Sequence, residues 1–220
     1  MALDDAVLGV DGCPGGWIGA LLTGSDIRWL LIPDAAAVLA VPAVAVGIDM
    51  PIGLPSNGPR ACDVTARCRL GPRRTSVFPA PVRAVLGAGT YDEACRRSRA
   101  VSGRALSKQT WYITDRIADL DAALRPADHE RVVEVHPELV FARLAGILPA
   151  KREAAGRELR EKALRAWLPG GWPEPPRPAR ADDALDALAC AWTARRWLTG
   201  DAEVLGGEPD ERGVPMRIVL

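Results

Sequence analysis

Several acidic residues stand directly after apolar runs, where a folded chain rarely places a charge. Asp11 follows VLGV, Asp49 follows VAVGI, and Glu134 follows two valines. An ionised carboxylate stays in such a place only when it is paired, hydrogen-bonded or bound to a metal, because a lone buried charge is costly. If the strands that carry Asp11 and Asp49 are parallel neighbours, both carboxylates emerge at the carboxyl ends of those strands. We therefore expect these two acids to reach one metal ion.

A late helix in the segment ADDALDALACAWTARRWL supplies further acids. Asp183 and Asp186 are three residues apart, so they lie on adjacent turns of one helix face, and Asp182 joins Asp186 at a spacing of four. Asp182 and Asp183 could equally cap the helix and favour its N-terminal dipole. Asp186 lies in the second turn, past the capping positions and between Leu185 and Leu188, which favours a ligand role.

Four or five carboxylates without clustered thiolates or imidazoles suit Mg²⁺ or Mn²⁺ better than Zn²⁺. The five cysteines show none of the spacings of a zinc site. Two metal ions about 4 Å apart could activate a water molecule and stabilise the leaving oxygen of an in-line phosphoryl displacement. This chemistry predicts a metal-dependent nuclease or phosphodiesterase whose partner and substrate is nucleic acid.

The elements that must position these acids follow from the hydrophobic pattern. Three short apolar runs separated by turn residues predict an antiparallel meander, and a β-branched run ending at Asp49 predicts a buried parallel strand. The later chain predicts one more strand and four helices, with Ser107 as an N-cap. The predicted strands are 7–11, 17–22, 27–32, 44–49 and 130–136, and the predicted helices are 34–41, 106–124, 138–147, 151–168 and 181–198. This order predicts an α/β fold with a mixed sheet.

Length and composition favour one globular domain. The chain has 220 residues, of which 48% are hydrophobic and 25% charged, and no apolar run is long enough to span a membrane. The first residues carry two aspartates and no basic region, so we expect no secretory signal and a cytoplasmic location. We assign residues 1–200 to the domain and residues 201–220 to a tail that could add a short terminal strand.

Residues 50–104 form an arginine- and proline-rich segment without a clear period, which we interpret as an insertion or lid. Between Arg60 and Arg104 stand ten arginines and three acids, a net charge of +7 in a chain whose formal net charge is zero. Such asymmetry could steer a polyanion toward one face, although a solvated surface is an equal alternative.

Six blocks of the sequence resemble the domain-of-unknown-function family 429 (DUF429), whose members are predicted RNase H-like nucleases. The blocks, in order, are GVDGCPGGWIGALL, VGIDMPIGLP, RRTSVFPAPVRAVL, LSKQTWYITDRIADLD, VVEVHPELVFARLAG and ADDALDALACAW. The resemblance implies a mixed sheet of RNase H type. The last block also resembles the final helix of RuvC-type Holliday-junction resolvases, which implies a metal-binding role for Asp183 and Asp186. On the same likeness Asp11 matches the first-strand aspartate, and Asp49 stands where resolvases place a glutamate.

Other residues are candidates with open alternatives. Glu134 has no place in the resolvase pattern, so with His136 and Glu138 it is an extra ligand or a supporting group, or else a strand-end acid paired to an arginine. Lys108 could contact the scissile phosphate, or it could be a surface cation. Candidate phosphate contacts in the insertion are Arg73, Arg74 and Arg83.

Two other functional classes compete with the nuclease hypothesis. An actin-like or sugar-kinase-like ATP site also begins with an aspartate and a glycine-rich turn, but it needs a second copy of the fold, and the chain has no internal repeat. A non-catalytic nucleic-acid or protein-binding module would keep the fold without turnover. A P-loop is excluded because the sequence has no G-x4-G-K-[ST] motif. The pattern leaves the oligomeric state open.

Overall fold

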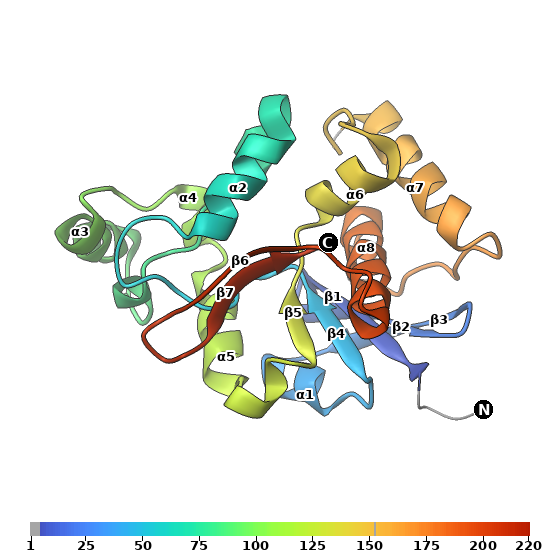
Figure 1. Ribbon diagram of the computed structural model, residues 1–220, viewed down its shortest axis with the longest axis horizontal. Helices are drawn as coiled ribbons and strands as arrows, with labels where there is room; N and C mark the ends of the chain where they lie inside the picture. The colour runs from blue at the N-terminus through green and yellow to red at the C-terminus, as the bar shows by residue number, and fades with distance from the viewer. Residues whose placement is uncertain (1–4, 152) are drawn as a thin grey trace.

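The computed structural model describes residues 5–151 and 153–220 and contains a mixed five-stranded sheet (Figure 1). The strand order is β3-β2-β1-β4-β5. The first three strands are antiparallel neighbours, whereas β4 and β5 continue the sheet in parallel with β1. The strands are β1 (Val7–Cys13), β2 (Gly16–Thr23), β3 (Asp26–Ile32), β4 (Ala45–Ile48) and β5 (Val132–Glu134). The predicted α/β fold with a mixed sheet is confirmed.

The register of the parallel strands decides which acids share a face of the sheet. Val10 of β1 pairs with Ile48 of β4, and Ile48 pairs with Glu134 of β5. Because successive side chains of a strand point to opposite faces, these three residues lie on one face and the residues that follow Val10 and Ile48 lie on the other. Asp11 and Asp49 therefore point to the face opposite Glu134.

Helices cover both faces of the sheet. On the face of Asp11 and Asp49, α8 (Ala181–Thr199) crosses the strands, with α6 (Pro137–Ala145) and α7 (Ala154–Trp167) beside it. On the opposite face, α1 (Ala35–Ala40) and α5 (Thr114–Ala123) pack against the sheet. Each face has its own buried apolar cluster, so the sheet is the middle of three layers.

Two glycines allow α8 to lie directly on the strands. A Cβ atom at Gly9 would stand 2.0 Å from the carbonyl oxygen of Ala187, and one at Gly47 would stand 2.5 Å from that of Cys190. Any side chain at these positions would collide with helix backbone. The close contact places the second turn of α8, with Asp186, above the carboxyl ends of β1 and β4.

The segment between β4 and α5 forms an arm beside the sheet (Figure 1). It contains α2 (Ala61–Leu70), two short 3-10 turns (Gly71–Ser76 and Arg83–Val85), α3 (Tyr91–Ser102) and α4 (Lys108–Trp111). After α8 the chain forms a hairpin of β6 (Val204–Pro209) and β7 (Pro215–Val219), and a parallel bridge from Val219 to Val135 joins β7 to the sheet edge. The hairpin also packs against α2.

The prediction of a single helix over residues 106–124 is wrong, because the segment forms α4 and α5 with a break between them. The hydroxyl of Thr114 donates a 2.7 Å hydrogen bond to the carbonyl of Trp111, an alternative to the helical ladder that favours a break. The predicted N-cap is confirmed, since Ser107 Oγ accepts a 3.0 Å bond from the backbone N–H of Thr110. Within the described ranges, no helix has the length and apolarity to cross a membrane.

Candidate metal centre

Three carboxylates from distant parts of the sequence meet at the carboxyl edge of the sheet. One oxygen each from Asp11, Asp49 and Asp186 lies within 4.8 Å of the other two. Asp11 ends the parallel part of β1, Asp49 follows β4, and Asp186 comes from the second turn of α8. The backbone N–H of Gly12 donates to Asp11 Oδ1 at 2.7 Å and fixes that side chain. The arrangement offers one cation three oxygen ligands from three rigid elements.

The three carboxylates have little positive charge around them to balance their own. Burial, and then repulsion by Asp49 and Asp186, raises the pKa of Asp11 well above its usual value. Burial raises the pKa of Asp49 to about 7 and that of Asp186 to about 6, although Lys151 opposes both shifts. Ionising all three acids together is therefore unfavourable unless a cation lies between them.

Among the described residues, Lys151 is the cation that contacts this cluster. It lies in the connection between α6 and α7, and its Nζ donates to Asp186 Oδ2 at 2.6 Å. Burial would lower the pKa of Lys151, but Asp186, Asp11 and Asp49 together raise it, so the ammonium stays charged. Its side chain is 47% exposed and lines the cleft above the acids. The sequence pattern did not indicate this residue.

A cleft of about 280 Å³ opens above the cluster. Its walls carry two further cations, Arg73 from the arm and Arg116 from α5, and the partly exposed ring of Phe78. Arg116 also donates to the carbonyl of Cys13 at 2.8 Å, which holds it against β1. Burial lowers the pKa of His136, another wall residue, so its ring is neutral near neutral pH. The cleft therefore combines acids on its floor with cations on its walls.

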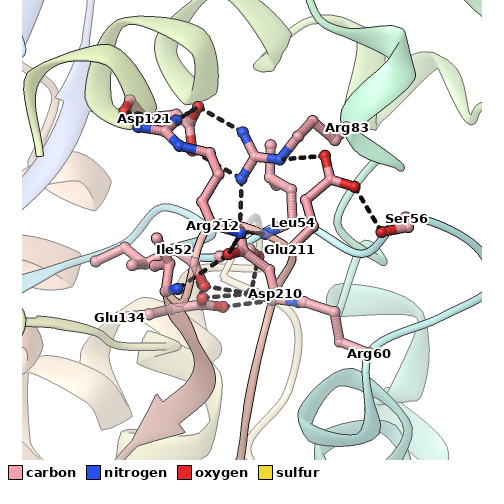
Figure 2. Close-up of polar contacts among 12 residues, drawn as sticks. Ile52, Leu54, Ser56, Arg60, Arg83, Asp121, Glu134, Asp210, Glu211 and Arg212 are labelled. Atoms are coloured by element: carbon pink, nitrogen blue, oxygen red, sulfur yellow. Dashed lines mark hydrogen bonds and ion pairs between the residues drawn. The ribbon is translucent and has the colours of Figure 1, made fainter. Parts of the chain in front are cut away.

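The structure does not bring Glu134 into the three-carboxylate cluster. Its two carboxylate oxygens accept hydrogen bonds from Arg60 at 2.6 and 2.7 Å, and one also accepts the N–H of Ile52 at 2.7 Å (Figure 2). The same guanidinium bonds Asp63 at 2.6 and 3.1 Å. Glu134 lines the cleft but points to the other face of the sheet. Its pairing with Arg60 is the alternative that the sequence left open, a strand-end acid paired to an arginine. The acid Glu138 is held in the same way, by two 2.8 Å bonds from Arg160.

Asp183 caps α8. Its Oδ2 accepts the backbone N–H of Arg180 at 2.9 Å, in the capping arrangement that the sequence left as an alternative to metal binding. In the part of the chain that the structure describes, the three-carboxylate cluster does not include Asp183, although its charge adds to the rise in the pKa of Asp11. The neighbouring Asp182 lies 3.8 Å from Arg157.

The basic candidates from the sequence divide into two groups. Arg73 lines the cleft, whereas Lys108 and Arg74 are exposed and are not part of its wall. Arg83 is engaged elsewhere, because it donates to Asp121 at 2.8 Å and to Asp210 at 2.5 Å in the network that Figure 2 shows. These contacts fasten the arm to α5 and to the C-terminal hairpin. Sequence reasoning missed Arg116 and Lys151, the other two cations that line the cleft in the described part of the chain.

Fold and site together define an α/β domain with a carboxylate centre at its sheet edge. The model of one protein family, described as a protein of unknown function (DUF429), matches residues 9–211. The chain belongs to this family. No curated protein and no solved structure matches the chain.

Proposed function

We propose that the protein is a divalent-metal-dependent nuclease, which binds Mg²⁺ or Mn²⁺ through Asp11, Asp49 and Asp186 and hydrolyses phosphodiester bonds of nucleic acid. The observation that carries this proposal is the meeting of these three carboxylates, with ligand oxygens within 4.8 Å of one another. Residues 11, 49 and 186 are far apart in the sequence, and each is placed by a different element of the core.

The donor set fits a hard divalent cation. All three donors are carboxylate oxygens, the ligands that Mg²⁺ and Mn²⁺ prefer, and no thiolate or imidazole belongs to the group among the described residues. The raised pKa values of the three acids also favour a bound cation, because the cation would relieve their mutual repulsion.

The topology adds an argument from analogy. The arrangement of the elements resembles that of RNase H-like nucleases. It consists of a three-stranded meander, two further parallel strands, and a long helix that crosses the first strand and carries an acid. In the described chain this sheet occurs once, so the two-lobed arrangement of an actin-like or sugar-kinase-like ATP site is not formed. Fold likeness alone does not establish an activity, and the site carries the proposal.

The residues of the cleft fit the needs of phosphodiester hydrolysis. A bound divalent cation would polarise the phosphoryl group and favour ionisation of the attacking water. Arg73, Arg116 and Lys151 present positive charge to the non-bridging phosphate oxygens. The exposed face of Phe78 offers a surface on which a base can stack. Water replaces the leaving oxygen on phosphorus, and that oxygen departs with a proton.

The test is a panel of single-stranded and duplex DNA, RNA, branched DNA junctions and ATP, incubated with Mg²⁺ or Mn²⁺. We expect cleavage of at least one nucleic acid by the wild type and none by Asp11→Asn or Asp186→Asn. Asp182→Asn is the matched control, because this residue is one helical turn from Asp186 and outside the cluster. Cleavage that survives both substitutions would refute the site. Tight binding without cleavage would identify a binding module, and ATP turnover would identify a kinase-like enzyme.

A further inference from the structure

Three of the six acids that line the cleft already have a guanidinium partner. Glu134 and Asp63 share Arg60, and Glu138 is held by Arg160. Among the described residues, the three carboxylates of the metal centre have only the ammonium of Lys151 at hydrogen-bond distance of one of them. Three ionised carboxylates and one ammonium leave two negative charges, which a single divalent cation balances.

Geometry also limits the number of ions. Ligand oxygens around one octahedral Mg²⁺ stand about 2.1 Å from the ion, so opposite ligands are about 4 Å apart. The cluster offers three oxygens within 4.8 Å of one another, close to the span of one such coordination shell. A second ion would need more carboxylates, but the other acidic candidates from the sequence are engaged elsewhere. Glu134 bonds to Arg60, Glu138 to Arg160, and Asp183 to the start of α8.

We propose that this centre holds one divalent cation and that Lys151 supplies the second positive charge, in place of a second metal ion. This inference rests on the proposed function and specifies how its site works. Two-ion centres place the second charge beside the leaving and attacking oxygens. Here the ammonium is held beside the ion by its 2.6 Å bond to Asp186.

The position of Lys151 suits contact with a substrate phosphate. An ammonium has three donors, and one of them bonds Asp186. The side chain is 47% exposed and lines the cleft, so the remaining donors are available to a phosphate oxygen that also approaches the ion. The loop between α6 and α7 would then act as a catalytic loop, placed by the packing of those helices against α8.

Mn²⁺ binding tests the number of ions without using activity. Titration calorimetry and electron paramagnetic resonance of the full chain, without substrate, are expected to count one Mn²⁺ per molecule. Lys151→Ala should still bind one ion, about tenfold more tightly, because a neighbouring positive charge has been removed. Lys151→Arg should keep the wild-type affinity. Lys162→Ala is the control, since this exposed lysine lies on α7 away from the cleft.

Hydrolysis at saturating Mn²⁺ tests the contribution of the ammonium. Lys151→Ala is expected to lose about a hundredfold in kcat, with partial recovery in Lys151→Arg and none of the loss in Lys162→Ala. Two ions per wild-type molecule, an unchanged Mn²⁺ affinity of Lys151→Ala, or full activity of that variant would each overturn the inference while leaving the proposed function intact. A wild type that binds no Mn²⁺ would overturn both.

Discussion

Two groups of acids lie at the same edge of the sheet, on opposite faces. The protein balances the negative charge of one group with a buried arginine and leaves that of the other group unbalanced. Asp63 and Glu134 share the fully buried guanidinium of Arg60, whose five N–H groups all have an acceptor nearby. Figure 2 shows the contact between Arg60 and Glu134. Asp11 and Asp49 have no such partner among the described residues and face each other and Asp186. The first group is complete as folded, whereas the second group keeps uncompensated negative charge that a cation would balance.

The two groups of acids differ in how their charge is balanced by neighbouring cations, and not in how deeply they are buried. Glu134 is 5% exposed and Asp186 is 4% exposed, so burial alone would rank them equally. What differs is the balance of charge around them. A network that is satisfied within the protein stabilises the fold, while a cluster of like charges destabilises it and is expected at a binding site.

The largest expected effect comes from Asp11→Asn. Hydrolysis should fall by at least about a thousandfold, because the substitution removes a ligand of the cation. In EDTA the same variant should melt at a higher temperature than the wild type, since one of three mutually repelling charges is gone. Activity assays and calorimetric melts measure the two effects. A variant that is less stable in EDTA would show that Asp11 belongs with the structural acids.

Glu134→Gln should show the reverse of Asp11→Asn, with a loss of stability and little change in hydrolysis. It leaves the buried Arg60 with Asp63 as its only full counter-charge among the described residues, so the free energy of unfolding should fall by about 4 kcal/mol. Urea unfolding in EDTA measures this loss. Hydrolysis per folded molecule should stay within a few fold of the wild type, and a thousandfold loss in folded protein would return Glu134 to the catalytic site.

Gly9→Ala tests the contact that carries Asp186 to the sheet. Its Cβ would stand 2.0 Å from one backbone atom of α8 and 2.1 Å from another, so the helix must move. We expect about 3 kcal/mol of destabilisation together with weaker Mn²⁺ binding, because Asp186 would be carried away from Asp11. Gly170→Ala is the matched control, since a Cβ there meets open space. Unchanged Mn²⁺ affinity in Gly9→Ala would show that the centre does not depend on this contact.

The positions of Asp11 and Asp49 could be predicted from the sequence because side chains alternate between the two faces of a strand. The tripeptides GVD at 9–11 and GID at 47–49 place a glycine and an aspartate on the same face of two neighbouring strands, so one helix can approach both. Glu134 differs because it pairs with Ile48 and therefore comes one register position earlier than Asp49. A strand end cannot be located in sequence to a single residue, and that one position decides the face.

Other parts of the centre depend on tertiary contacts that no local pattern records. Lys151 lies in a connection whose path is set by the packing of α6 and α7 on α8. Asp183 had two valid roles at the start of a helix, and the bond to Arg180 selects capping. Similarly, nothing in the basic segment 60–104 distinguishes Arg73, which lines the cleft and lies 3.5 Å from Glu138, from Arg60 and Arg83, which hold acids away from the three-carboxylate cluster.

The smallest expected effect is a pH dependence of stability that belongs to the metal centre. The pKa of Asp49 is about 7 in the folded chain, against 3.8 for an ordinary aspartate, so between these values the folded state holds the proton that the unfolded state has lost. Its favourable contribution is therefore present at low pH and is lost as the pH rises through about 7. In EDTA the wild type should lose about 2 kcal/mol of stability relative to Asp49→Asn between pH values of about 5 and about 8.

Unfolding of the two proteins in EDTA across this pH range measures that difference, with Asp182→Asn expected to follow the wild type. Adding Mg²⁺ should stabilise the wild type more at about pH 8 than at about pH 5, because the ion binds the ionised carboxylates and competes with protons. The stability that the Arg60 network contributes should not depend on Mg²⁺, since its acids already have their counter-charge. A stability difference that does not change with pH, or a Mg²⁺ effect that Asp49→Asn retains in full, would place Asp49 among the satisfied acids.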